Sequence, residues 1–324
     1  MRTVSKYYPV FSLRFVRALI IHMRPYLWFV SGVAGLSGMA MGWQVENSPA
    51  KFVLLFLPFF LGYGFGQALT DCFQIDTDSL SAAYRPLVKG QISPKTLGTV
   101  SLTGLVLIGF PVIWFNFGNI VFCILSVFGL ATYTYFKKNF RLVGPFYNGW
   151  IVMLLPVMGF MGVNGQNFGS LLSLNVFLCC AVTMFSYATF VLIGYLKDIT
   201  ADRSTGYKTF PVAYGWNKSV WLSDLFVGIV ILSGLILISG GNVISLIIFL
   251  IGSVIAVTGQ LYAHFTKNKS EENSAYPIVS TVRAFLLWHI SLITNFQPAW
   301  IWFCVVFYMA FEVVLYYRPE KAQI

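Results

Sequence analysis

The sequence predicts an all-α, polytopic membrane protein, a bundle of about nine to ten transmembrane helices. Of its 324 residues, 57% are hydrophobic and only 10% are charged, and that charged fraction is less than half of what an ordinary soluble domain carries. Runs of about 20 mainly apolar residues, the length of a helix that crosses a bilayer, recur along the whole chain. No linker or shift in composition divides it, so we expect residues 1–324 to form a single transmembrane domain.

The loops between the predicted spans alternate in charge, which indicates their sidedness. All 21 Lys and Arg residues except Lys51 and Arg283 lie in the N-terminal segment, the charged loops or the C-terminal tail. Because cytoplasmic loops are the ones enriched in Lys and Arg, the charged loops and both termini are predicted to be cytoplasmic, and this requires an even number of spans. The charged loops are 78–95, 137–141, 197–218 and 264–276. The predicted spans are 25–44, 51–77, 95–115, 118–136, 144–163, 171–196, 217–238, 243–265, 277–295 and 298–317.

The net charge and the cysteines exclude several other classes of function. The net charge of +10 follows from the loop asymmetry, so it indicates topology and attraction to anionic membrane lipids, with no nucleic-acid partner. The five cysteines lie in or beside apolar runs without metal-ligand spacing, which favours core packing over a disulfide framework or a zinc site. The N-terminal segment lacks an apolar core followed by a small-residue cleavage site, so we expect the first span to remain as an anchor.

Two acidic clusters at the ends of predicted spans carry the strongest functional signal. In DCFQIDTD, a continuous helix would place Asp71 and Asp78 about 20° apart, with Gln74 between them along one polar stripe. In YLKDITAD, Asp198 and Asp202 are four residues apart, the spacing that puts two side chains on one helix face. Both clusters follow even-numbered spans, so they are expected at the same, cytoplasmic end of the bundle.

Carboxylates that converge at one membrane face repel each other unless a cation lies between them. Mg²⁺ prefers oxygen ligands and usually binds one or two carboxylates together with substrate phosphates. Arg85 and Lys89 follow the first cluster, and Arg203 and Lys208 follow the second. The pattern predicts two Mg²⁺ ions that hold a diphosphate at the membrane surface, with an apolar substrate tail among the helices. Helix capping or simple solvation explains a single cluster equally well, and also explains Asp76, but explains two such clusters less well.

The first cluster resembles a motif of the UbiA superfamily of intramembrane prenyltransferases. That motif is written NxxxDxxxD, often with Asp directly after the Asn. Here it aligns with Thr70, Gln74 and Asp78, and Asp71 takes the extra Asp position. The segment YRPLVKGQIS, residues 84–93, is similar to the RP-(L/I)-x-x-G-x-I-S segment of the family.

Two further features support the same resemblance. The second family motif, DxxxD, matches Asp198 and Asp202, and KDITADRSTGYKTFPVAYG resembles the stretch that follows it. A third feature, YxxxK, matches Tyr133 and Lys137 at the end of the fourth predicted span. The resemblance extends over nearly the whole chain in motif order and spacing.

The resemblance implies a bundle of nine helices around a central cavity, with a core at about 20–296 and an extra span at 298–317. It implies Mg²⁺-dependent transfer of an isoprenyl group from an isoprenyl diphosphate to an aromatic or lipid acceptor within the membrane, with release of diphosphate. It implies that Tyr133 orients the phosphate or faces a carbocation. The implied metal ligands are Asp71, Gln74, Asp78, Asp198 and Asp202. The implied diphosphate contacts are Arg85, Lys89, Lys137, Arg203 and Lys208.

Two departures from the family pattern leave alternatives open. Thr70 replaces the usual Asn and Gln74 replaces the usual Asp, and an amide oxygen can ligate Mg²⁺ but adds no negative charge. A UbiA-type terpene cyclase that needs no acceptor is therefore one alternative, and a homologue without activity is another. A transporter is the alternative of a different class, but transporters usually carry polar groups near mid-membrane, whereas these acidic residues gather at one face.

Overall fold

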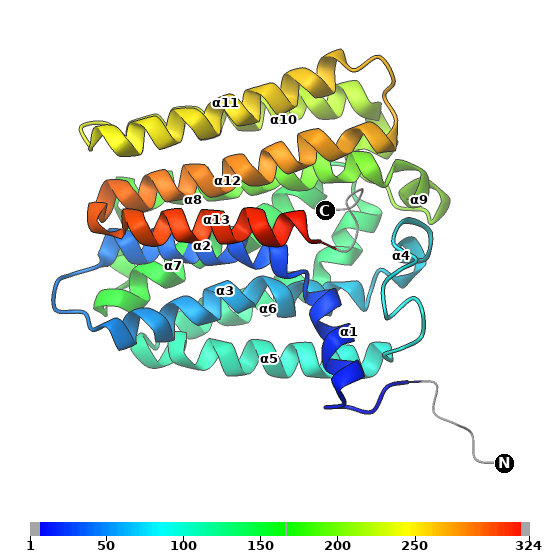
Figure 1. The fold of residues 1–324 in the computed structure, drawn as a ribbon, viewed down its shortest axis with the longest axis horizontal. Coiled ribbons are helices and arrows are strands. Elements are labelled where there is room, and N and C mark those ends of the chain that lie inside the picture. The colour runs from blue at the N-terminus through cyan, green and yellow to red at the C-terminus, as the bar shows by residue number, and fades with distance from the viewer. Residues whose placement is uncertain (1–6, 166, 319–324) are drawn as a thin grey trace.

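The computed structural model describes residues 7–165 and 167–318, which form a bundle of long helices joined by short loops (Figure 1). Within these ranges nine helices are long and apolar enough to cross a membrane, and one bent helix pair provides a possible tenth span. The predicted fold class is therefore confirmed. The two ends of the chain, which the sequence assigns to the cytoplasmic side, lie outside the described residues.

The helix bounds follow local sequence signals. Side chains of Ser48, Ser93, Ser173 and Asn242 each accept the N–H three residues ahead and so cap the helices that follow them. The long helices are α2 (Pro25–Gly42), α3 (Pro49–Asp71), α5 (Pro94–Phe115), α6 (Asn119–Asn139), α7 (Val143–Asn164), α8 (Leu174–Gly194), α10 (Phe210–Ile238), α11 (Val243–Phe265), α12 (Ala275–Phe296) and α13 (Ile301–Tyr316). The short elements are α1 (Leu13–Met23), α4 (Ile75–Ser81), α9 (Ile199–Ser204) and the 3-10 turns η1 (Phe168–Leu172), η2 (Tyr195–Lys197), η3 (Glu271–Ser274) and η4 (Pro298–Trp300).

A sharp bend separates α1 from α2. The two helices meet at an angle of 56°, and the residue between them, Arg24, has a left-handed φ of 49°. Pro25 occupies the first position of α2, where its missing N–H costs nothing, but it cannot continue the hydrogen bonding of α1. The bend places Arg24 at the N-terminal end of α2, where it is the N-cap residue.

The second predicted span, 51–77, is interrupted, so the predicted continuous polar stripe is wrong. α3 ends at Asp71, and α4 begins only at Ile75. Between them the helix tightens into 3-10-type turns, in which the N–H of Gln74 donates to the C=O of Asp71 at 3.2 Å. Gln74 itself is not helical (φ −123°, ψ 23°), so the residues on either side of the break no longer share one helix face.

The same interruption recurs at the second motif. α8 passes through the turn η2, and Asp198 then adopts φ −115° and ψ 13° as the N-cap of α9. Gln74 holds the equivalent place as the N-cap of α4, and Asp78 and Asp202 each follow four residues later. α4 and α9 lie next to each other at one end of the bundle (Figure 1). The two acidic motifs therefore meet at the same end, as the sequence predicts.

The central helices pack closely, and α13 covers them from outside. A Cβ at Gly38 of α2 would lie 1.9 Å from the carbonyl oxygen of Pro156 in α7, so the close approach of these two helices requires glycine. On the outer face of α2, the rings of Phe29 and Phe307 of α13 lie 4.8 Å apart, and Phe311 is fully buried. α13 thus closes the bundle along α2.

Candidate active site

A cavity opens at the end of the bundle that carries α4 and α9, and it extends down between α2, α3, α5, α6, α7 and α8. Its volume is about 240 Å³. The mouth is polar and the deeper part, called the shaft below, is mainly apolar. The charged and amide side chains at the mouth are Arg24, Gln67, Asp71, Gln74, Asp78, Arg85, Lys137, Lys197 and Asp198. Apolar residues of the shaft include Pro58, Phe59, Leu105, Ile108, Val112, Ile151, Leu155 and Met158.

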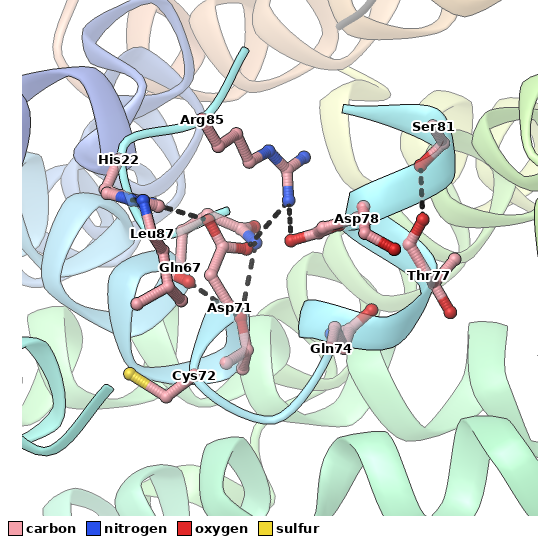
Figure 2. Close-up of polar contacts among 12 residues, drawn as sticks. His22, Gln67, Asp71, Cys72, Gln74, Thr77, Asp78, Ser81, Arg85 and Leu87 are labelled. Carbon is pink, nitrogen blue, oxygen red and sulfur yellow. Dashed lines mark hydrogen bonds and ion pairs between the residues drawn. The ribbon is translucent and has the colours of Figure 1, made fainter. Parts of the chain in front are cut away.

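Arg85 lies between the two aspartates that flank the break after α3 (Figure 2). Its Nη1 forms a close ion pair with Oδ2 of Asp78 and lies 3.4 Å from Oδ1 of Asp71. The loop after α4 folds back so that the N–H of Arg85 donates to the C=O of Ala82, which aims the side chain inward, where only 8% of the residue is exposed. Arg85 thereby supplies a cation between two carboxylates that would otherwise repel each other.

The Asp71 carboxylate is buried and accepts several further hydrogen bonds. Nη2 of Arg24 and Nε2 of Gln67 lie 2.9 Å and 2.8 Å from its Oδ1. Nδ1 of His22 lies 3.2 Å from Oδ2, while Nε2 of His22 accepts the N–H of Leu87 at 2.9 Å, so Nδ1 is the nitrogen that donates to Asp71. With 1% of Asp71 exposed, both of its oxygens are occupied by protein donors.

Lys137 connects the two motifs from α6. Its Nζ donates to Oε1 of Gln74 at 3.3 Å and lies 3.5 Å from Oδ1 of Asp202. It also lies 5.0 Å from the ring centroid of Tyr207. Oδ2 of Asp202 accepts a hydrogen bond from Oγ1 of Thr209 at 3.1 Å. Its Oδ1 has no hydrogen bond within the described residues. One buried lysine therefore links the N-cap of α4 to the acidic residue of α9.

Burial raises the pKa of Asp78 and of Asp202, both of which lie outside the spans. The positive charges of Arg85 and Lys137 oppose this rise in the pKa of Asp78 and Asp202 respectively, but they do not cancel it. The nearby cations therefore only partly offset the cost of burying these two carboxylates in their ionised form. A further cation at this place would stabilise them.

Two tyrosine pairs lie directly below the charged mouth. The hydroxyl oxygens of Tyr133 on α6 and Tyr195 are 2.6 Å apart, and those of Tyr63 on α3 and Tyr187 on α8 are 3.3 Å apart. All four side chains line the cavity. Tyr133 lies one helical turn before Lys137 on α6 and Tyr63 lies about two turns before Asp71 on α3, so aromatic rings line the cavity over the first turns below the charged mouth.

The family of the chain is settled by comparison with known proteins, because a model of the UbiA prenyltransferase family matches residues 31–290. The chain belongs to the UbiA prenyltransferase family. The digeranylgeranylglyceryl phosphate synthase of Pyrococcus abyssi is 24% identical over 212 residues, which cover 65% of this chain and 74% of that protein. The chloroplastic chlorophyll synthase of Avena sativa is 28% identical over 207 residues, covering 61% of this chain and 53% of that protein.

A solved structure supports the same fold. A UbiA homolog from Archaeoglobus fulgidus, bound to DMAPP and Mg²⁺, aligns with a TM-score of 0.62 at 16% identity and covers 85% of this chain and 99% of its own. The predicted family is thus confirmed, and the chain is an enzyme of the prenyltransferase class. α13 lies beyond the part of the chain that the family model matches.

In this UbiA bundle, the carboxylate and amide oxygens at the mouth are suitable ligands for an Mg²⁺ ion that is bound together with a phosphate. The carboxylates of Asp78 and Asp198 and the amide of Gln74 line the same cavity. Among residues 7–165 and 167–318, no group of three or more His, Cys, Asp or Glu side chains could hold a metal alone. Mg²⁺ often binds only one or two carboxylates and takes its remaining ligands from phosphate and water, which this mouth allows.

The structure brings some of the predicted diphosphate contacts to the mouth and leaves others outside. Arg85 and Lys137 line the cavity and are buried. Lys89 and Lys208 are exposed on the surrounding loops and Arg203 is exposed on α9, and none of the three lines the cavity. Proximity in sequence to an acidic motif therefore does not by itself place a basic residue at the site.

Three mouth residues are missing from the set that the motifs indicate. Arg24 reaches the mouth because of the bend between α1 and α2, and Lys197 directly precedes the second motif. Gln67 lies one helical turn before Asp71 and donates to it. The signals that could have found them are an Arg-Pro pair at the start of a span, a basic residue beside DxxxD, and the i, i+4 spacing of Gln67 and Asp71.

Asp76 has a role that the sequence did not indicate. Nζ of Lys138 lies 2.9 Å from its Oδ2, and the Tyr207 hydroxyl donates to its Oδ1 at 3.2 Å. Its Oδ1 also accepts the N–H of Thr77 within the first turn of α4, whose N-cap is Gln74, so Asp76 is not the capping residue. Partial burial raises the pKa of Asp76, but the hydrogen bonds from Lys138, Thr77 and Tyr207, together with the charge of Lys138, outweigh this and the net pKa is lowered. Asp76 thus ties α4 to α6 and to the loop after α9.

Proposed function

We propose that this UbiA-family enzyme transfers an isoprenyl group from an isoprenyl diphosphate to an aromatic or lipid acceptor within the membrane, and that it requires Mg²⁺. The cavity that opens beside α4 and α9 supports this most, because its mouth gathers carboxylates and cations while its shaft is apolar. Lys137 at the mouth and Cys123 in the shaft both line it from α6, and the helical rise between them corresponds to about 21 Å. A molecule with an anionic head and a long apolar tail matches this shape.

Asp78 and Asp198 are the proposed carboxylate ligands of Mg²⁺, with Gln74 as a neutral ligand. Bound there, Mg²⁺ would neutralise the diphosphate and make it a better leaving group. Gln74 already accepts from Lys137, so its amide oxygen is turned toward the mouth. An amide at this position also reduces the repulsion among the acidic groups, at the cost of weaker attraction for the metal.

We assign Asp71 and Asp202 to positioning roles in place of the metal-ligand roles that the motifs suggested. The oxygens of Asp71 hold Arg24 and lie beside Arg85. Asp202 lies beside Lys137 and does not line the cavity. These two aspartates would hold the three cations in the places where they contact diphosphate oxygens. Charge-assisted contacts from arginine are well suited to that task, because guanidinium groups match phosphate geometry.

The proposed reaction begins when the allylic C–O bond breaks and its electron pair leaves with the diphosphate. The cations at the mouth stabilise that departing charge. The remaining carbocation would form at the level of the tyrosine pairs that include Tyr133 and Tyr187, whose ring faces attract a cation. The acceptor supplies the electron pair of the new bond and loses a proton.

We place the mouth on the cytoplasmic side of the membrane. The loops and short helices that surround it carry most of the basic residues, including Lys89, Arg203 and Lys208, whereas Lys51 lies on the opposite side. Loops that are rich in Lys and Arg face the cytoplasm, which supports this orientation. Soluble diphosphate substrates would then reach the mouth directly.

Diphosphate release by the purified protein in nanodiscs tests the proposal. Geranyl, farnesyl and geranylgeranyl diphosphate are supplied with Mg²⁺, with and without a pool of aromatic and lipid acceptors. We expect release that needs both Mg²⁺ and an acceptor and that is lost in Asp78→Asn and Asp198→Asn. Asp224→Asn, which alters a carboxylate paired with His264 away from the cavity, is the matched control. Release without an acceptor, giving a hydrocarbon or alcohol, would instead identify a cyclase. No release and no Mg²⁺-dependent diphosphate binding would contradict both.

A further inference from the structure

A second hollow lies between the start of α12 and the end of α13, and its volume is about 680 Å³. Both helix ends lie at the end of the bundle that carries α4 and α9 (Figure 1). This outer hollow, as it is called below, is lined by Tyr276, Val279, Arg283, Glu312, Leu315 and Arg318. None of these residues lines the central cavity, and α13 lies beyond the residues that the family model matches. The outer hollow is therefore separate from the proposed reaction site.

Arg283 on α12 uses only one edge of its guanidinium group to hold α13. Its Nε and Nη2 each lie 2.7 Å from an oxygen of Glu312. Among residues 7–165 and 167–318, the Nη1 of Arg283 has no hydrogen-bond partner. A guanidinium group is a planar fork that can bind one anion on each edge, and it matches phosphate geometry well. Arg283 thus keeps N–H donors for a further acceptor in the outer hollow.

Arg318 brings a second cation to the same hollow. It directly follows the last turn of α13, where its Nη1 donates to the C=O of Leu315 at 2.8 Å. Burial and the charge of nearby Arg283 lower the pKa of Arg318, and the opposite effect of Tyr26 does not cancel them. Two guanidinium groups therefore share the outer hollow with one carboxylate, that of Glu312. A bound anion would relieve the repulsion between the two arginines.

The position of the outer hollow along the helices matches the membrane interface. The helical rise places Arg283 about 12 Å from the start of α12 and Glu312 about 6 Å from the end of α13, and a long arginine side chain can reach toward the headgroups from this depth. Tyr276 and Tyr316, which line the hollow, are exposed, as is typical of tyrosines at the interface. Val279 and Leu315 add an apolar wall. The outer hollow thus combines charged donors with an apolar surface at the edge of the bilayer.

We propose that the outer hollow binds one anionic phospholipid, whose phosphate accepts hydrogen bonds from Arg283 and Arg318 and whose acyl chains begin along Val279 and Leu315. A zwitterionic phospholipid such as phosphatidylcholine carries a cation beside its phosphate, and the two arginines repel that cation, so the site prefers a lipid with net negative charge. The bound lipid joins α13 to α12 at an end where the two helices have few direct contacts. The inference does not depend on the reaction assigned to the central cavity.

Native mass spectrometry of the full-length protein in an uncharged detergent tests the site, because it resolves each bound lipid. Dioleoyl phosphatidylglycerol and dioleoyl phosphatidylcholine are titrated separately. In Arg318→Gln we expect the affinity for the first phosphatidylglycerol to fall about fivefold, the typical effect of one basic residue at an anionic lipid. Arg17→Gln is the matched control, because it removes the same charge from an exposed arginine of α1 outside the hollow and should leave this affinity unchanged. An equal fall in both variants, or equal binding of the two lipids by the wild type, would overturn the proposal.

Glu312→Gln provides a second test with the opposite sign. The substitution removes the carboxylate of the outer hollow and releases the second edge of Arg283, so the affinity for phosphatidylglycerol should rise about two- to fivefold. Asp224→Asn is the matched control, because it removes a carboxylate that is paired with His264 outside the hollow, and it should leave the affinity unchanged. A lower or unchanged affinity in Glu312→Gln would contradict an anion site at Arg283, since a purely structural role of the ion pair predicts no gain.

Thermal unfolding distinguishes a lipid from other occupants of the outer hollow. Phosphatidylglycerol should raise the melting temperature of the wild type more than that of Arg318→Gln, whereas inorganic phosphate at the same concentration should raise neither, because it has no acyl chain to bury. Equal protection by inorganic phosphate would show a simple anion site and would overturn the lipid proposal. Protein dimers in the mass spectra that disappear in Arg318→Gln would instead identify an interface between two copies and would also overturn it. None of these readouts involves turnover, so their outcome is independent of the proposed reaction.

Discussion

Arg85 separates two buried carboxylates, and its replacement by leucine gives the most informative stability measurement. Removing one partner of a buried ion pair typically costs about 3–5 kcal/mol, because the other charge is left uncompensated. Asp78 loses its close partner, while Asp71 retains Arg24, so we expect a loss near the lower value. With about 2 °C of melting temperature per kcal/mol, as found for larger domains, the melting temperature should fall by about 6 °C.

Thermal unfolding of the purified protein, followed by tryptophan fluorescence, measures this effect with and without Mg²⁺. Mg²⁺ should stabilise Arg85→Leu more than the wild type, because a divalent cation can take the place of the lost guanidinium between the carboxylates. Arg203→Leu is the control, since Arg203 is an exposed arginine outside the cavity, and its melting temperature should be unchanged. An Arg85→Leu protein as stable as the wild type, or equal stabilisation of both by Mg²⁺, would refute the reasoning.

Three further predictions concern the contacts of Asp76 with Lys138 and Tyr207, the last helix α13, and the metal. Asp76→Asn weakens the link to Lys138 and Tyr207, so KM for the diphosphate should rise by about two- to fivefold with little change in kcat; a fall in kcat alone would contradict this. Glu312→Gln breaks the two-point ion pair with Arg283 that ties α13 to α12. Because both side chains are partly exposed, the free energy of unfolding should fall by about 1 kcal/mol or less, and an altered KM would contradict this. Removal of Mg²⁺ with EDTA should abolish diphosphate release, Mg²⁺ should restore it and Ca²⁺, which takes more ligands at longer distances, should restore it less; activity that persists in EDTA would exclude the metal role.

The spans could be predicted well because each is an apolar run of sufficient length, often with a capping Ser or Asn before it. The break after Asp71 could not be predicted in the same way. The residues CFQ contain neither proline nor glycine, so nothing local ends the helix there. The turn accompanies the long-range contacts of Asp71 with His22, Arg24 and Arg85, which become visible only when distant segments are packed together.

The composition of the site shows the same division between local and tertiary information. The convergence of the two acidic motifs follows from span parity and motif spacing, which the sequence contains. The sequence does not reveal which basic side chains reach the mouth, because this depends on the path of the backbone. Arg24 enters through a bend between two helices, whereas Lys89 follows the first motif closely and still points away from the mouth.

Binding of a non-reactive isoprenyl diphosphate analogue, such as geranyl thiolodiphosphate, tests the central claim most directly. It is titrated into the wild type, Asp78→Asn, Asp198→Asn and the control Asp224→Asn, each with and without Mg²⁺. The proposed site predicts binding that tightens with Mg²⁺ in the wild type and in the control, and a loss of that Mg²⁺-dependent gain in the other two variants. Equal affinity with and without Mg²⁺ in the wild type, or unchanged Mg²⁺-dependent binding in Asp78→Asn and Asp198→Asn, would contradict it.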